Sequence, residues 1–119
     1  MVAQLDASIR AVYELAAFSE TEKKTLKLIA EYLRYRRENS EPDKPPPKCF
    51  TYKGLRWYYN KQRWYKTLEW HTVERNIRRF AELGWLSRRI FGTPRGGKTA
   101  LFCLTSNLEY ILEKLGWLQ

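Results

Sequence analysis

The chain has 119 residues, of which 44% are hydrophobic, and its 22 Lys and Arg against 13 Asp and Glu give a net charge of +9. This length fits one domain, and the charge excludes an acidic protein and favours a polyanionic partner. No apolar run approaches the roughly 18 residues of a membrane span, and the first residues lack the pattern of a signal peptide. We therefore expect a cytoplasmic protein without a membrane partner.

Two helices are predicted at the start of the chain. Apolar side chains recur at helical spacing over residues 3–17, which predicts an N-terminal helical extension over 1–18. Ser19 and Glu22 form a capping-box pattern, which starts a second helix over about 20–38. Four prolines follow within residues 39–48, and because proline lacks an amide donor we expect a Pro-rich loop over 39–53.

The middle of the chain is predicted to hold a strand and two further helices. The aromatic run Leu55–Tyr59 has the composition of a strand, and Asn60 is placed to cap a short helix over residues 61–66. His71 or Thr72 is then expected to cap a longer helix, which ends at Gly84. Its apolar face consists of Val73, Ile77 and Phe80.

A β-hairpin and a last helix complete the predicted fold. Residues 85–91 and 99–104 have strand patterns on either side of a turn over 92–98 that is rich in glycine. Ser106 and Glu109 repeat the capping pattern, which predicts a C-terminal helix over 106–119. We therefore expect a mainly α fold with a small β-hairpin (α+β), a winged helix-turn-helix with helical extensions at both ends, forming a single domain over 1–119.

The turn also matches the phosphate-binding pattern Gly-x4-Gly-Lys-Thr, from Gly92 to Thr99. Such a loop must open a helix, whereas the residues after Thr99 have a strand pattern. We therefore interpret it as a hairpin turn, and we expect no enzyme activity and no cofactor. Cys49 and Cys103 are too few for a disulfide scaffold or a four-ligand zinc site, and Cys103 is interpreted as a small core residue of a protein from a reducing compartment.

The positive charge is concentrated in the middle of the chain. Residues 43–98 hold fourteen basic and four acidic side chains, whereas residues 1–42 hold seven of each. A run of charge is often only a solvated surface. Here the sign is uniform and aromatic residues alternate with the cations, which favours nucleic acid as the partner.

Several residues of this region resemble the winged-helix domain of phage and plasmid replication initiators, the replisome organisers. The residues that carry the resemblance are Gly54–Asn60, Trp64, Thr72, Val73, Arg75, Ile77, Arg79, Phe80 and Gly84–Leu86. The resemblance implies a non-catalytic, sequence-specific double-stranded DNA-binding protein of a mobile element, with a role in replication initiation or transcription regulation and a nucleoid-associated location. Replication or transcription proteins are then further partners, and the terminal helices are candidates for a homodimer contact.

The candidate contacts with DNA fall into two groups. The start of a recognition helix reaches base edges, where Arg pairs with guanine and Asn with adenine. The expected base contacts are His71, Thr72, Arg75, Asn76 and Arg79, while Arg78 ranks lower because Glu74 and Glu82 are spaced to pair with it. The expected contacts of the wing and the DNA backbone are Arg56, Lys61, Arg63, Lys66, Arg88, Arg89, Arg95, Gly96, Gly97 and Lys98.

Two alternatives remain open from the sequence alone. Winged helices also bind proteins, which predicts an acidic partner. Trp57, Trp64 and Trp70 are expected to fill the core, but aromatics among cations also stack on unpaired bases, which predicts a single-stranded nucleic-acid binder.

Overall fold

The computed structural model describes residues 15–118. Within them, four α-helices and a three-stranded antiparallel sheet form an α+β fold. In chain order the elements are α2 (Glu20–Glu38), β1 (Cys49–Thr51), α3 (Tyr52–Lys61), the 3-10 turn η1 (Trp64–Lys66), α4 (Trp70–Glu82), β2 (Leu86–Gly92), β3 (Lys98–Leu104) and α5 (Ser106–Lys114). The predicted helix at 3–17, and with it half of the predicted dimer contact, lies almost entirely outside the described residues. No helix of the described part is long and apolar enough to cross a membrane.

The second predicted helix is confirmed as α2, with its boundaries and its cap. The backbone N–H of Glu22 donates to Ser19 Oγ at 3.2 Å, and the Glu22 carboxylate accepts from the backbone N–H of Ser19 at 2.8 Å. This reciprocal pair satisfies two donors at the helix start. One face of α2 is buried, with Leu26, Ile29 and Leu33 in the core.

The predictions for residues 49–66 are wrong. Leu55–Tyr59 belongs to helix α3, because Thr51 caps the helix by accepting a hydrogen bond from the Gly54 N–H at 3.1 Å. Asn60 lies inside this helix and caps nothing, and only η1 replaces the helix predicted over 61–66. The Pro-rich loop ends at Lys48 rather than at 53, because β1 follows it directly.

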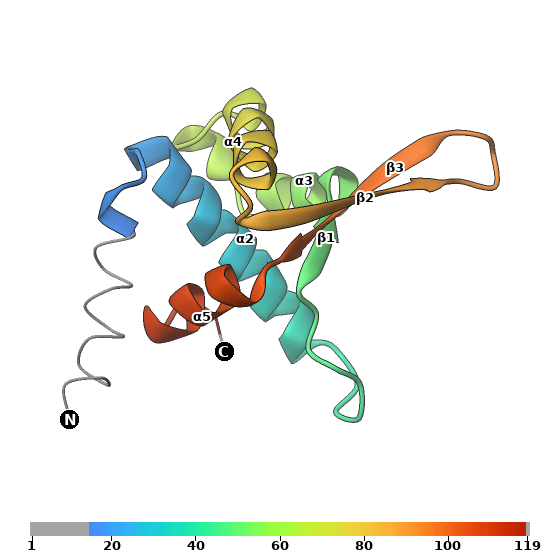
Figure 1. Cartoon of the computed structure of the whole chain (residues 1–119), viewed down its shortest axis with the longest axis horizontal. Helices are drawn as coiled ribbons and strands as arrows, with labels where there is room; N and C mark the ends of the chain where they lie inside the picture. Colours follow the sequence, from blue (N-terminus) through green and yellow to red (C-terminus); the bar gives the residue numbers. More distant parts are fainter. Residues whose placement is uncertain (1–14, 119) are drawn as a thin grey trace.

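The hairpin is confirmed, and it consists of the edge strand β2 and the central strand β3 of the sheet. The strand order is β1-β3-β2, and β2 pairs with β3 over seven residues from Leu86–Leu104 to Gly92–Lys98. Figure 1 shows that this hairpin projects beyond the helices, with its turn at the far end. Phe50 and Phe102 stack at the root of the sheet with ring centroids 5.8 Å apart, and both are buried. The hairpin is therefore anchored in the core at one end and free at the other.

Cys49 and Cys103 occupy opposite positions on β1 and β3 and form a disulfide. The prediction of Cys103 as a small core residue is therefore wrong, since Cys103 is half-buried and bonded to Cys49. The missing signal is the β1 strand itself, since 54 residues separate the two cysteines in the chain and only strand pairing brings them together.

The last helix begins one residue earlier than its predicted cap implies. Thr105, not Ser106, accepts the hydrogen bond from the Leu108 N–H at 3.3 Å. The helix ends at Lys114, and Gly116 follows with a φ of 77°, a left-handed conformation that glycine adopts without steric cost. Its predicted apolar side chains Leu108, Ile111 and Leu112 are buried.

Candidate nucleic-acid interface

Helix α4 holds three side chains in the core, and this fixes which residues it turns outward. Val73, Ile77 and Phe80 are fully buried, as their spacing predicts. At 100° per residue, the opposite face carries four side chains, which are His71, Arg75, Arg78 and Glu82. All four are exposed.

The cap of α4 lies two or three residues before the predicted cap, which was His71 or Thr72. The helix begins at Trp70, and Glu69 occupies the cap position without a side-chain cap hydrogen bond. His71 and Thr72 therefore lie in the first turn and not at the cap. The His71 imidazole lies 3.2 Å from the Glu69 carboxylate, and both side chains are exposed.

Arg75 and Arg78 are the two cations of this outward face that are left without a counter-ion. Within residues 15–118, neither guanidinium has a carboxylate within 4.0 Å. The expected pairing of Arg78 with Glu74 or Glu82 is absent from this part of the chain. Arg78 thus joins the candidate site, and the sequence signal that ranked it lower was only the spacing of those two glutamates.

Arg79 serves a different purpose, because it links α4 to α2. Its Nε forms an ion pair with Glu22 Oε2 at 3.1 Å, and the Glu22 side chain is only 12% exposed. Glu22 already caps α2 through its other oxygen. One carboxylate therefore fixes both the start of α2 and the position of α4 beside it.

Asn76 is also internal. Its side chain is 4% exposed, and its Nδ2 donates to Thr25 Oγ1 at 3.1 Å. Thr25 in turn donates to the carbonyl of Thr21 at 2.8 Å. The Asn76 amide thus joins α4 to α2 through a buried hydrogen bond. We therefore remove Asn76 from the candidate base contacts.

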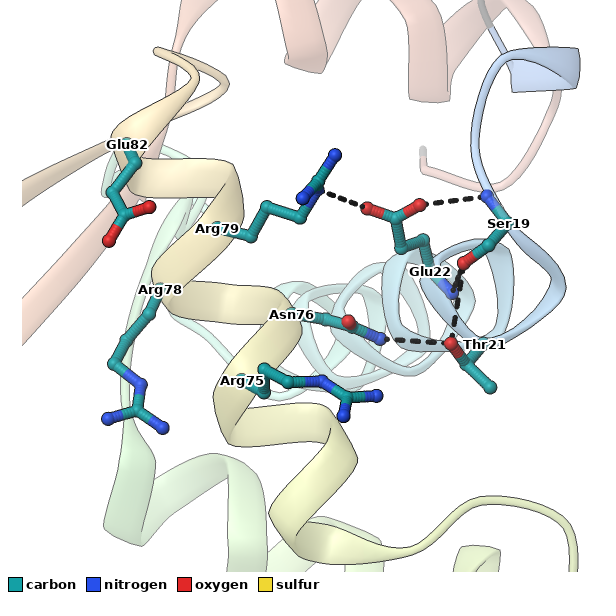
Figure 2. Close-up of a pocket in the computed structure, with 8 residues that line it drawn as sticks. All are labelled: Ser19, Thr21, Glu22, Arg75, Asn76, Arg78, Arg79 and Glu82. Carbon is teal, nitrogen blue, oxygen red and sulfur yellow. Dashed lines mark hydrogen bonds and ion pairs between the residues drawn. The ribbon is translucent and has the colours of Figure 1, made fainter.

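A groove separates the outward face of α4 from the start of α2. Its volume is about 490 Å³, and Arg75 and Arg79 line one side while Ser19 and Thr21 line the other. Figure 2 shows the guanidinium groups of Arg75 and Arg79 extending from α4 across this groove, toward the first turn of α2. Amide groups at a helix start and arginine side chains both favour an anion.

The hairpin presents Arg88 and Arg89 to opposite sides. Arg88 lies opposite Phe102, which is buried against the helices, so Arg88 shares the helix-facing side of the sheet. Arg89 lies opposite Leu101, one position further along, and therefore points to the other side. Of these two predicted contacts, only Arg88 shares a side with α4.

The ionisation of Tyr52 reflects how close the basic residues of α4 and β2 lie. This phenol packs against the Phe102 ring with centroids 4.9 Å apart. Burial raises its pKa above the ordinary value, while the positive charges of Arg78 and Arg88 act to lower it. Arg78 of α4 and Arg88 of β2 therefore both lie within electrostatic reach of this phenol, as does the Glu74 carboxylate of α4, which acts to raise its pKa.

The turn at the end of the hairpin contains two glycines, which lack the side chains that would keep a ligand away from the backbone. Gly96 has a φ of 84°, and the Gly97 N–H donates to Thr93 Oγ1 at 3.0 Å. Arg95 and Lys98 are exposed beside these glycines. Lys98 lies opposite Gly92 on the same side of the sheet as Arg88, in alternation along the strands. The strand that follows Lys98 confirms that this is a hairpin turn and not a P-loop.

The remaining predicted cations surround α3 and η1. Arg56 lies over the Trp70 ring at 5.7 Å, and Lys61 lies over the Trp57 ring at 4.8 Å. Lys61 is also 5.6 Å from the Tyr35 ring of α2, so it belongs to the α2 side of the molecule. Arg63 and Lys66 are exposed in the turn before α4.

Among the three tryptophans expected in the core, one is not there. Trp64 and Trp70 are partly buried against the core cluster, whereas Trp57 is 49% exposed. Tyr58 and Tyr59 are buried instead, and Tyr59 donates to the Leu68 carbonyl at 2.6 Å. Burial raises the pKa of the Tyr59 phenol, which keeps it protonated as this hydrogen bond requires.

Residues 15–118 contain no group of three His, Cys, Asp or Glu side chains placed to hold a metal ion. Comparisons with models of protein families, with curated proteins and with solved structures found no match. The surface formed by Arg75, Arg78, Arg88 and Lys98 is called the α4–hairpin surface below.

Proposed function

We propose that this chain is a non-catalytic winged helix-turn-helix domain that binds double-stranded DNA in a sequence-specific manner. In this proposal α3 and α4 form the helix-turn-helix, α4 enters the major groove, and the β2–β3 hairpin is the wing on the backbone or in the minor groove. The observation that carries the proposal is the α4–hairpin surface. Arg78 of α4 and Arg88 of β2 both lie near Tyr52, and neither has a carboxylate within 4.0 Å among the described residues.

The proposed role of each residue in this surface follows from the chemistry of its side chain. Arg75 and Arg78 lie on the outward face of α4, where a guanidinium has the two parallel donors that guanine accepts. Arg88 and Lys98 lie on the hairpin and supply positive charge to the phosphates. Arg95 at the turn is close to two glycines, which allow the backbone to approach a groove.

The groove beside α2 supports a further contact on the other side of α4. A phosphate of the bound strand would meet Arg75 and the hydroxyl of Thr21 there. The ion pair with Arg79 partly neutralises the negative charge of Glu22, so that the Glu22 carboxylate repels the phosphate less. We also propose, from the resemblance described above, that the role of the protein lies in replication initiation or regulation of a mobile element.

The test is selection from random pools of duplex DNA, single-stranded DNA and RNA at about 150 mM salt. The proposal predicts retention of duplex DNA and enrichment of one sequence motif. The enrichment should be lost in an Arg75→Ala variant that retains its melting temperature. Retention without enrichment, or preferential retention of single strands, would contradict the proposal.

One observation favours a second candidate function. Trp57 is half exposed with the Lys61 ammonium over its ring, which suits stacking of an unpaired base. That function would make Trp57→Ala reduce retention of single strands while Arg75→Ala leaves it unchanged. The pool selection therefore separates the two candidates directly.

A further inference from the structure

The Cys49–Cys103 disulfide joins two parts of the fold that carry the proposed DNA contacts. Cys49 begins β1, and β1 leads directly into α3 at Tyr52. Cys103 lies in β3, the strand that forms one side of the hairpin. A single covalent bond thus connects the start of α3 to the root of the hairpin.

The strand pairing at this point is short. β1 pairs with β3 only over residues 49–51 and 101–103, while residues 98–100 of β3 pair with β2 alone. An edge strand of three residues has few backbone hydrogen bonds, and such segments open locally at low free-energy cost. The disulfide adds a covalent link to the other contacts that hold β1 on β3, which are the buried stack of Phe50 on Phe102 and the hydrogen bond from the Leu104 N–H to the Lys48 carbonyl at 2.9 Å.

The two cysteines are also placed where a small thiol or disulfide can reach them. Both are half-buried, and by strand alternation both lie on the side of the sheet opposite to Phe50 and Phe102. The Arg36 guanidinium donates to the Cys49 carbonyl. The thiolate is the reactive form of cysteine.

We propose that Cys49 and Cys103 form a reversible thiol–disulfide site whose oxidation by a low-molecular-weight disulfide strengthens duplex binding. One thiolate attacks the small disulfide and releases one small thiol, which leaves a mixed disulfide. The second protein thiolate then displaces the second small thiol and closes the Cys49–Cys103 bond. The two protein thiols lose two protons and two electrons, and the small disulfide becomes two thiols.

Closure affects binding because it fixes the root of the hairpin before DNA arrives. With β1 held to β3, less conformational entropy is lost when Arg88 and Lys98 are ordered on the backbone. The inference rests on the proposed function, since its main readout is duplex affinity. We expect the oxidised protein to bind duplex about 5-fold more tightly than the reduced protein.

The experiment uses the full chain equilibrated with glutathione and glutathione disulfide at several ratios. Alkylation and mass measurement count the free thiols in each sample, and duplex affinity is measured on the same samples. The matched controls are Cys49→Ser and Cys103→Ser, which preserve side-chain size and cannot form the bond. Their affinity should equal that of the reduced protein at every ratio, whereas the unsubstituted protein should change affinity as its thiol count falls from two to none.

Two results would overturn the inference while leaving the proposed function intact. They are thiols that never close at any glutathione ratio, and a closed disulfide with unchanged duplex affinity. If neither redox form retains duplex, the proposed function fails, and hydrogen exchange then tests the inference separately. Slower exchange of the β3 amides in the oxidised form would support the fixed hairpin root, and equal exchange in both forms would refute it.

Discussion

The α4–hairpin surface and the opposite surface, formed by α2 and α5, differ in what their cations contact. On the α2–α5 side, Arg37 pairs with Glu109 at 3.2 Å and Lys23 with Glu20 at 3.5 Å. On the α4–hairpin surface, Arg75 and Arg78 have no carboxylate within 4.0 Å among the described residues. Like charges placed together without counter-ions repel and destabilise the compact state. Lys27 and Arg34 of α2 also lack a carboxylate within 4.0 Å among the described residues. The comparison therefore teaches that the position of an unpaired cation, and not the lack of a partner alone, has to identify an interface.

Removing both arginines from the outward face of α4 should have the largest effect. In Arg75→Ala/Arg78→Ala, duplex affinity should fall by about 100-fold, because both proposed base contacts are lost. The melting temperature should not fall, since neither side chain has an ion pair in the described chain. Fluorescence anisotropy and thermal melting measure the two quantities.

The control for this variant removes the same charge from the other side of the molecule. Lys27 and Arg34 are exposed on α2, so Lys27→Ala/Arg34→Ala should change duplex affinity by no more than about 2-fold. An equal loss in both double variants would mean that net charge alone drives binding.

Asn76→Ala should have the opposite effects to the double arginine variant. It should lower the stability of the fold strongly and change duplex affinity little. The buried amide donates to Thr25, and its loss leaves that hydroxyl without this partner in the core. We expect a loss of about 1–3 kcal/mol in the free energy of unfolding. Denaturant titration measures it, and duplex affinity well below the melting temperature should be unchanged. Unchanged stability with weakened binding would return Asn76 to the interface.

Glu82→Gln should produce the smallest change among the α4 variants, and in the opposite direction. Glu82 lies on the same outward face as Arg75 and Arg78, where its negative charge repels a phosphate. Its neutralisation should strengthen duplex binding by about 2-fold. The control is Glu38→Gln at the exposed end of α2, which should have no effect, and a weaker affinity in Glu82→Gln would place this side chain in a direct contact.

The local signals in the sequence were sufficient for much of this fold. The apolar spacing of Val73, Ile77 and Phe80 gives the face of α4 correctly, and the Ser19–Glu22 cap gives the start of α2, because each depends only on residues within a few turns. The glycine-rich turn likewise marks the hairpin.

The errors arose where distant contacts decide the structure. Leu55–Tyr59 has β-type composition, yet it is helical because Thr51 caps it and the buried Tyr58 and Tyr59 pack against the core. Asn76 was predicted at the interface because the helical periodicity of α4 alone cannot show that α2 packs against the side of α4 that carries Asn76. The Cys49–Cys103 bond depends on the short β1 strand, whose three residues lie at the end of the proline-rich loop.

The central claim is that position, and not total charge, makes the α4–hairpin surface a DNA interface. Arg88 and Arg89 provide the most direct test, because they are neighbours with the same charge on opposite sides of one strand. Duplex affinity should be measured for Arg88→Ala and Arg89→Ala across a range of salt concentrations. We predict that Arg88→Ala weakens binding by about 10-fold and lowers the slope of log K against log salt by about 1, while Arg89→Ala stays within about 2-fold. Equal losses in the two variants, or a larger loss for Arg89→Ala, would contradict the account.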